Sequence, residues 1–314
     1  MPKLLRGANR QRYRIWRDRL FVFCIRGLRT TLARIGVRRA IAMGAVLGSL
    51  AMRLLPHTRR VSVDQMAAAF PDRSTTEIDR DVRQMFCGLG RTLVEVILLD
   101  EIAADLDAWV DTEGFDVLDR ALAQGQGVIA ITGHVGNWEL MAATLGLHGY
   151  PLTAIATPVK GVALNQENID LRKRVGVETL PRDGAGAAKA ILRTLKAGRI
   201  LGILMDQDTE GRGVMVPFFG RPAYTPVGPA VLSWRTGAPI VSVFIHRGAD
   251  GRHCFRIREL DLPERHGVER EGREEWQRAA TACLTRAIEE QIRPRPDQWV
   301  WWHQRWRRSA GGET

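Results

Sequence analysis

The sequence predicts an α/β protein with a mostly parallel central sheet flanked by helices, and with an N-terminal helical region that associates with a membrane. Beyond about residue 110, short apolar runs of strand length alternate with segments of helical periodicity, which is typical of a parallel sheet covered on both faces. Before that point the segments have only helical periodicity. The third observation is that the positive charge of the chain is concentrated at the N-terminus.

Residues 1–39 form a basic arm that holds twelve lysines and arginines and one acidic residue, Asp18. The formal net charge of the whole chain is +11, and the arm alone accounts for it. A basic arm on a neutral body predicts binding to an anionic surface. Large apolar side chains such as Trp16, Phe21 and Phe23 lie between the arginines. We therefore expect the partner to be anionic membrane lipid and not nucleic acid.

The most apolar stretch of the chain, residues 41–55, follows the arm and contains Arg53. It is shorter than the roughly 20 residues that a membrane-spanning helix needs. We therefore expect helices that lie in the membrane interface; a single N-terminal span and a core helix of a soluble protein are the alternatives. On this basis we divide the chain into N-terminal helices at 1–60 and an α/β domain at 61–314.

The remaining elements follow in order along the chain. A short helix is expected at 61–70, and a long helix runs from about Ser74 to Leu99, with the capping-box pattern Ser74-x-x-Glu77 at its start. The predicted strands are 127–132, 152–157, 199–205, 239–245 and 253–259. The predicted helices are 114–124, 137–148, 163–175, 185–197, 226–237 and 272–291.

The composition fits a globular protein, with 45% hydrophobic and 26% charged residues. Its four cysteines are widely separated and form no CxxC pair. We therefore expect reduced thiols, no disulfide framework and no zinc site.

Residues 127–145, GVIAITGHVGNWELMAATL, have the strongest functional pattern. A buried strand leads into a glycine-punctuated turn that contains His134, and a helix is expected to begin near Asn137, a good N-cap residue. This turn lies at the carboxyl end of the strand, where open α/β sheets bind ligands. An imidazole there could take a proton from a hydroxyl while Glu139 holds its other nitrogen. The alternative is a loop histidine that caps the helix or packs against it.

Two charged groups also lie at or beyond predicted strand ends. Arg172, Lys173 and Arg174 end a helix and could hold a phosphate, or could form a solvated helix face. The acidic block 206–208, Asp-Gln-Asp, directly follows a strand, and its alternatives are helix capping and metal binding. Two carboxylates beside one glutamine make a poor metal site, so we expect no metal.

Two aromatic segments complete the candidates. The Gly/Pro-rich segment 216–228, VPFFGRPAYTPVG, carries Phe218 and Phe219, which suit an acyl-chain wall or a lid, or else anchor the loop. Residues 297–308, DQWVWWHQRWRR, place four tryptophans among arginines. That pattern fits an aromatic belt at the level of lipid headgroups, or ordinary packing of a C-terminal strand or helix.

Taken in this order, the motifs resemble those of the bacterial lipid A biosynthesis acyltransferases, the late lauroyl or myristoyl transferases of the wider lysophospholipid acyltransferase superfamily. The resemblance covers nearly the whole chain, from about Gly44 to Arg308. The segments that carry it are GHVGNWE, RKRVGVETLPR, LMDQD, VPFFGRPAYTPVGPA, TGAPIVSVFIHR and QWVWWHQRW.

The resemblance implies roles for individual residues. His134 and Glu139 fall on the family's His-x4-acid dyad, which implies that Nε2 of His134 deprotonates an acceptor hydroxyl while Glu139 holds Nδ1. Arg172 falls on the arginine that the family places near a substrate phosphate, and we expect Arg174 to assist it. The other substrate-binding positions are the acidic block Asp206, Gln207 and Asp208, the loop residues Phe218, Phe219 and Gly220, and Thr225.

The resemblance further implies transfer of a fatty acyl group from acyl-carrier protein to a hydroxyl of a lipid A precursor, at the cytoplasmic face of the inner membrane and without a cofactor or metal. The basic arm would also attract the acidic carrier protein. Phosphatidylinositol mannoside acyltransferases are similar enough to be an alternative, as are other glycolipid or lysophospholipid acyltransferases. Two alternatives belong to other functional classes. One is a thioester hydrolase, but the sequence lacks the G-x-S-x-G motif expected of one. The other is a non-catalytic lipid-binding protein at the membrane.

Overall fold

The computed structural model describes residues 18, 20, 22–159, 161–264 and 272–308. Within them a seven-stranded sheet has the order β1-β9-β8-β2-β5-β3-β4. Every neighbouring pair is parallel except β8 and β9, so the predicted α/β class is confirmed. The strands are β1 (Val110–Glu113), β2 (Val128–Thr132), β3 (Leu152–Ala156), β4 (Glu178–Pro181), β5 (Ile200–Leu204), β8 (Ile240–Arg247) and β9 (His253–Glu259).

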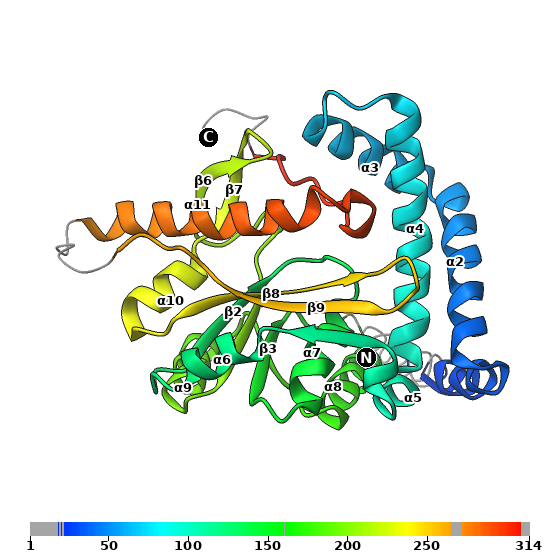
Figure 1. Cartoon of the computed structure of the whole chain (residues 1–314), viewed down its shortest axis with the longest axis horizontal. Coiled ribbons are helices and arrows are strands. Elements are labelled where there is room, and N and C mark those ends of the chain that lie inside the picture. The colour runs from blue at the N-terminus through cyan, green and yellow to red at the C-terminus, as the bar shows by residue number, and fades with distance from the viewer. Residues whose placement is uncertain (1–17, 19, 21, 160, 265–271, 309–314) are drawn as a thin grey trace, which may run out of the picture.

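Helices cover both faces of the sheet (Figure 1). Strand β2 shows why, because all five of its residues are buried and its side chains point alternately to the two faces. Ala130 belongs to an apolar cluster with residues of α6 and α7, and Ile131 belongs to a second cluster with residues of α9 and α11. The helices of this part are α6 (Phe115–Leu122), α7 (Trp138–Leu147), α8 (Val162–Arg174), α9 (Ala187–Lys196), α10 (Gly228–Thr236) and α11 (Arg273–Ile292).

The N-terminal part is helical, as predicted. Its named helices are α2 (Val37–Leu54), α3 (Pro56–Ala69), α4 (Thr75–Ile97) and the short α5 (Leu99–Ala103). The predicted capping box opens α4: the Glu77 backbone N–H donates to the Ser74 hydroxyl oxygen, and the Glu77 carboxylate accepts from the Ser74 backbone N–H at 2.8 Å. Residues 22–35 are also helical. The predicted boundary at residue 60 falls within α3.

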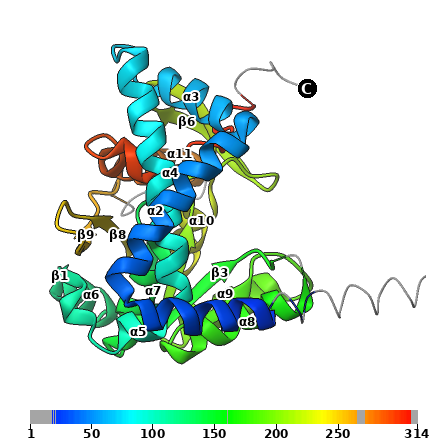
Figure 2. The ribbon, with the colours of Figure 1, turned by 90° about the vertical axis from the view of Figure 1, so that its right-hand side faces the viewer.

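Helices α2 and α4 lie side by side at a very short distance (Figures 1 and 2). A Cβ atom added at Gly48 would lie 2.0 Å from the backbone oxygen of Phe86, and one added at Gly44 would lie 2.4 Å from that of Gly90. Only glycine permits this approach. The opposite side of α2 is an exposed apolar stripe, the α2 stripe, which consists of Met43, Val46, Leu47, Leu50 and Leu54.

Among the described residues, no single helix is long and apolar enough to cross a membrane. The consecutive helices α2 and α3 pass that test only when taken together, and they are bent by 94° relative to each other. About half of the basic arm, residues 1–17, 19 and 21, lies outside the described residues.

One segment differs from its prediction. Residues 216–228, expected to be a loop, contain most of a two-stranded antiparallel hairpin, β6 (Gly213–Phe218) and β7 (Arg221–Pro226). Phe219 and Gly220 connect its strands, with φ values of 51° and 72°. Positive φ at both central residues is the geometry of a tight hairpin turn, so the Phe-Gly pair closes a turn where we expected an open loop.

Candidate active site

The turn between β2 and α7 holds His134 at the carboxyl end of the sheet, as predicted. Asn137 is the N-cap of α7, and its side-chain oxygen accepts a hydrogen bond from the Leu140 backbone N–H at 3.0 Å. Gly136 has φ +60°, and a Cβ there would lie 2.1 Å from the backbone oxygen of Ile245. The glycine thus lets the turn lie against β8 and sets the position of the histidine.

Asp206 is the direct partner of His134. Strands β2 and β5 are parallel neighbours with Thr132 opposite Leu204, so the residues that follow each strand meet. The Asp206 carboxylate lies 2.9 Å from His134 Nδ1 through Oδ1, and its Oδ2 accepts from the His134 backbone N–H at 2.8 Å. The indole N–H of Trp299 donates to the same Oδ2 at 2.7 Å. Asp206 is therefore buried and fixed from three directions.

These contacts set the protonation of the pair. Burial of the His134 ring disfavours its charged form, but the Asp206 carboxylate outweighs that effect, so the pKa of His134 is raised above its usual value. Burial of Asp206 would raise its pKa, but the opposing effects of His134 and of the Trp299 hydrogen bond leave the pKa of Asp206 lowered. An ionised Asp206 accepts the proton on Nδ1, which leaves the lone pair on Nε2.

Glu139 does not hold Nδ1, and this part of the expected His/Glu dyad is wrong. Its carboxylate instead accepts two hydrogen bonds from Arg172, at 2.9 Å from Nε and 2.5 Å from Nη2. The bidentate guanidinium is a strong partner for a carboxylate, and Asp206 already occupies Nδ1. The charge of Glu139 still contributes to the raised pKa of His134.

A cavity of about 620 Å³ contains these groups. His134, Glu139, Arg172 and Gln207 line its polar part. The Gln207 amide nitrogen lies 3.1 Å from Nδ1 and 3.4 Å from Nε2 of the imidazole. Beneath α7 the cavity extends into an apolar lobe, which is lined by Ala130, Ala142, Leu145, Leu152, Ala154, Gly202 and Val243.

The C-terminal segment, residues 297–308, contributes to the wall of the cavity, and our sequence interpretation missed this contribution. Val135 pairs with Trp299 in an isolated β-bridge, and further along the segment Trp302 and His303 line the cavity. The ring centres of His303 and His134 are 6.2 Å apart, and burial lowers the pKa of His303. The position of His303 inside the motif QWVWWHQRW was the available signal.

Most of the C-terminal tryptophans pack in the interior and form no aromatic belt. Trp299, Trp301 and Trp306 are buried, and only Trp302 is exposed, at 37%. Of the two interpretations of this segment, packing is therefore correct for three of its four tryptophans.

Several predicted substrate-binding residues lie elsewhere. Phe218 and Phe219 are 1% and 6% exposed and belong to the main apolar cluster, because the hairpin turn directs them inward. Of the two interpretations of this pair, a wall or lid of the acyl-chain site is wrong, and anchoring of the segment is correct. Gly220 belongs to the turn, and buried Thr225 receives a hydrogen bond from the Arg305 side chain at 2.5 Å. None of these four residues lines the cavity.

The remaining two predicted residues are engaged in ion pairs. Arg174 contacts Asp100 at 3.2 Å and does not line the cavity, so it points away from Arg172 at the end of α8. Asp208 does line the cavity, and it pairs with Arg307 at 3.1 Å. It thereby ties the end of β5 to the C-terminal segment.

Comparison with known proteins adds to this geometry. A family model described as bacterial lipid A biosynthesis acyltransferase matches residues 9–308. The chain belongs to this family. Two proteins of Escherichia coli (strain K12) are similar to this chain over most of its length. It is 27% identical over 277 residues to the lipid A biosynthesis palmitoleoyltransferase, covering 87% of this chain and 86% of the relative. It is 24% identical over 276 residues to the lipid A biosynthesis lauroyltransferase, covering 86% of each chain.

The chain is also similar, at higher identity but over a shorter stretch, to phosphatidylinositol mannoside acyltransferases. It is 34% identical over 143 residues to the phosphatidylinositol mannoside acyltransferase of Mycobacterium tuberculosis (strain CDC 1551 / Oshkosh), covering 45% of each chain. The chain thus spans about half the length of the mannoside acyltransferases that it matches.

Proposed function

We propose that this protein transfers a fatty acyl group from acyl-carrier protein to a hydroxyl of a lipid A precursor, as a late, secondary acylation. The observation that carries the proposal is the His134–Asp206 pair in a cavity with an apolar lobe. A histidine whose Nδ1–H is held by a carboxylate is suited to act as a general base. An apolar lobe beside it suits an alkyl chain. Family membership supports acyl transfer as the reaction class.

In the proposed reaction, Nε2 of His134 takes the proton of the acceptor hydroxyl while the hydroxyl oxygen attacks the thioester carbonyl. Asp206 stabilises the imidazolium that forms. The carbon–sulfur bond then breaks, and the imidazolium returns the proton to the leaving thiolate. The products are an ester and the free thiol of the carrier protein, so the step balances without a cofactor or metal. The Gln207 amide, beside the imidazole, is available to donate to the oxyanion.

Arg172 and Glu139 serve the acceptor in this proposal. A guanidinium has five N–H donors, and Glu139 accepts from two of its nitrogens. Donors therefore remain for a phosphate of the acceptor. Glu139 holds the arginine side chain in the cavity and supports the charge that His134 acquires. Arg174, paired with Asp100 outside the cavity, has no part in this step.

Two acceptor classes are supported by different observations. The match to a lipid A acyltransferase extends over 87% of the chain, which favours a lipid A precursor. The higher identity, 34% over 143 residues, favours a phosphatidylinositol mannoside. We propose the lipid A precursor because its support extends over both the N-terminal helices and the C-terminal segment.

The proposed location is the cytoplasmic face of the inner membrane. The exposed α2 stripe would enter the membrane interface, and the basic arm would bind anionic lipid and the acidic carrier protein. The bent pair of α2 and α3 supports a re-entrant or broken span as the alternative arrangement.

The test uses purified full-length protein, fatty acyl-carrier-protein thioesters of graded length, and the two acceptors in separate reactions, with products followed by mass spectrometry. We expect one added acyl chain on the lipid A precursor. His134→Ala should reduce transfer by about 10²- to 10⁴-fold, the usual contribution of a general base. The matched control is His148→Ala at the other end of α7, whose Nδ1 contacts the Thr144 backbone oxygen and not the cavity.

The other outcomes separate the alternatives. Acylation of the mannoside alone would show that the acceptor is a phosphatidylinositol mannoside, and the assignment of His134 as the base would stand. Release of free fatty acid that does not depend on an acceptor would favour a hydrolase. No turnover with any donor would favour a lipid-binding protein, and full activity of the His134 variant would overturn the assigned base.

A further inference from the structure

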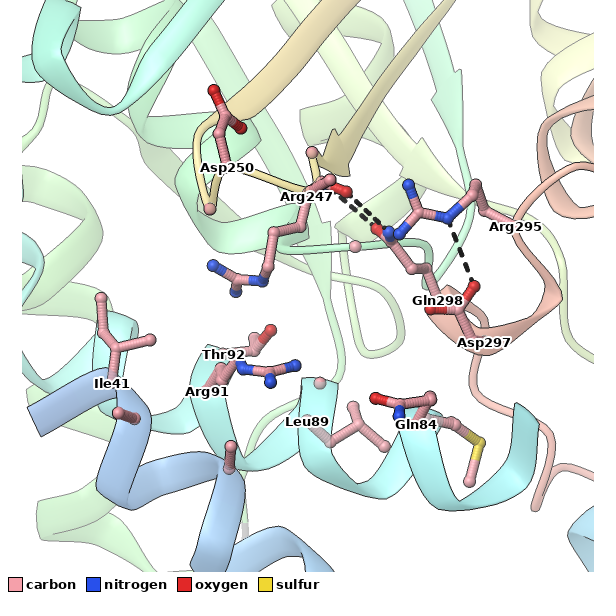
Figure 3. A pocket seen from close by; sticks show the side chains of 18 of the residues that line it. Ile41, Gln84, Leu89, Arg91, Thr92, Arg247, Asp250, Arg295, Asp297 and Gln298 are labelled. Carbon is pink, nitrogen blue, oxygen red and sulfur yellow. Dashed lines mark hydrogen bonds and ion pairs between the residues drawn. The ribbon is translucent and has the colours of Figure 1, made fainter. Parts of the chain in front are cut away.

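A second cavity, of about 520 Å³, lies between α2, α4, the β8–β9 turn and the segment before Trp299. Figure 3 shows the side chains that line it. One part of its wall is apolar, with Ile41, Met85 and Leu89 among its members. The other part is rich in arginine, and it also contains the neutral polar side chains of Gln84, Thr92 and Gln298. The lining is therefore amphiphilic.

Four arginines line this cavity, and two of them are already neutralised. Arg247 makes a bidentate ion pair with Glu95, a fully buried carboxylate behind the wall. Arg295 pairs with Asp297 at 3.4 Å. Within the part of the chain that the structure describes, these two pairs leave Arg38 and Arg91 as the lining cations without an ion-pair partner.

Among the described residues, no carboxylate lies within 4.0 Å of the guanidinium of Arg38 or Arg91. Arg38 lies over the ring of Trp109, at 5.2 Å from its centre. The one other acid of the lining, Asp250, accepts from the Arg252 backbone N–H at 3.1 Å. Its carboxylate is turned away from Arg91 and from Arg247 (Figure 3).

We propose that this cavity binds a phosphate group, with Arg91 as the principal ligand and Arg38 as the second. Guanidinium groups bind phosphate through paired, charge-assisted hydrogen bonds, and the Thr92 hydroxyl at the same wall can add a donor. The phosphate can belong to a lipid headgroup or be free in solution. Because α2 forms one wall and carries the exposed α2 stripe, a lipid bound with its headgroup here would have apolar protein surface close by.

The cavity also reaches the turn of the active site. Gly136 lines it, and the Glu95 carboxylate that pairs with Arg247 accepts from the Asn137 side-chain amide at 2.9 Å. A ligand in this cavity would therefore contact the turn that carries His134 without entering the cavity of the proposed reaction.

Binding is tested by calorimetric titration of the full chain with inorganic phosphate and, separately, with a monomeric short-chain phosphatidylglycerol, in the absence of any acyl donor. We expect saturable binding of at least one probe. Arg91→Gln should weaken it by about tenfold or more, because charge-assisted hydrogen bonds are lost. The matched control is Arg83→Gln, an exposed arginine of the same helix that does not line the cavity.

Melting temperatures measured without ligand check that both variants are folded, and the rise in melting temperature with ligand gives a second readout. Tighter binding of the lipid than of phosphate would identify a headgroup as the source, and equal binding would identify a free phosphate. Failure of the wild type to bind either probe, unchanged binding by Arg91→Gln, or an equal loss in Arg83→Gln would overturn the proposal. None of these results depends on whether the protein transfers acyl groups.

Discussion

Asp206 is the residue that sets the orientation and the tautomer of the His134 imidazole. It fixes the ring through Nδ1, fixes the turn through the backbone N–H, and is itself fixed by the Trp299 indole. Even a Cβ atom at Gly133 would lie 3.1 Å from the Asp206 side chain, so the glycine permits the close approach. One buried carboxylate thus selects both the orientation and the tautomer of the proposed base.

At this scale we predict the effect of Asp206→Asn. The raised pKa of His134 means that the proposed base is protonated, and transfer is slow, at pH values below that pKa. Loss of the carboxylate should lower the pKa, which moves the acidic limb of the kcat/KM profile to lower pH. The plateau should fall by about a thousandfold or more, because the neutral amide also favours the wrong tautomer. The measurement is the pH–rate profile of acyl transfer.

Glu139→Gln is the matched comparison for this prediction. It weakens the Arg172 pair and leaves the Asp206 contact in place. We expect it to raise the KM for the acceptor more than it lowers kcat. If the acidic limb of the kcat/KM profile stayed in place in Asp206→Asn but moved to lower pH in Glu139→Gln, Glu139 and not Asp206 would set the pKa of His134.

Helix α7 joins the two parts of the proposed site. Its N-cap turn carries His134, and its buried face forms the roof of the apolar lobe through Ala142 and Leu145. Three small residues of the lobe lie side by side on the sheet, because Gly202 of β5 is in register with Ala130 of β2 and Ala154 of β3. The volume open to an alkyl chain is therefore set by a few side chains on α7, β3 and β5.

We predict that Ala142→Leu shortens the acyl chain that the protein prefers. The larger side chain fills part of the lobe and excludes several methylenes, each of which contributes about 0.8 kcal/mol when buried. Activity with the best wild-type donor should fall by about tenfold or more, and activity with shorter donors should persist. A donor-length series with the purified variant measures this effect. An equal loss at every length would show that the lobe does not hold the chain.

Helices and strands could be predicted from the sequence where the periodic pattern of apolar residues extended over a long segment. Helix α4, its capping box and the strand–turn–helix around His134 all agree with the prediction. Strands β1 and β4 were not predicted, because VDTE and ETLP are four-residue edge strands that contain acidic residues. The sequence also could not identify Asp206 as the partner of His134 Nδ1, because local patterns do not reveal that β5 lies next to β2.

Viewed as a whole, the molecule presents an apolar edge along α2, on the side opposite to its close contact with α4. Gly44 and Gly48 hold α2 against α4, so the α2 stripe is attached rigidly to the part of the molecule that carries the cavities. The G-x-x-x-G spacing of these residues is a known signal of close helix packing. It could have been recognised in the sequence, where we considered only the length of the apolar run.

We predict that Leu47→Glu combined with Leu50→Glu weakens binding to anionic vesicles by about tenfold or more, because each leucine contributes about 1.5–3 kcal/mol when it is fully buried in an apolar phase. Leu147→Glu, an exposed leucine on α7, is the control and should bind as the wild type does. Vesicle sedimentation measures both. The residual binding should decline as salt is raised, because the basic arm acts through screened charges. Equal binding by all three proteins would remove α2 from the membrane contact.

The Trp299 indole has a consequence for biosynthesis. Trp299 follows Asp206 by 93 residues in the chain, and its indole N–H completes the set of hydrogen bonds that hold the Asp206 carboxylate. A nascent polypeptide that has already paired β2 with β5 still lacks this anchor. Catalytic competence therefore requires that Trp299 has been synthesised, and a product terminated between β9 and Trp299 would contain all the strands of the sheet but would lack the hydrogen bond that holds Asp206.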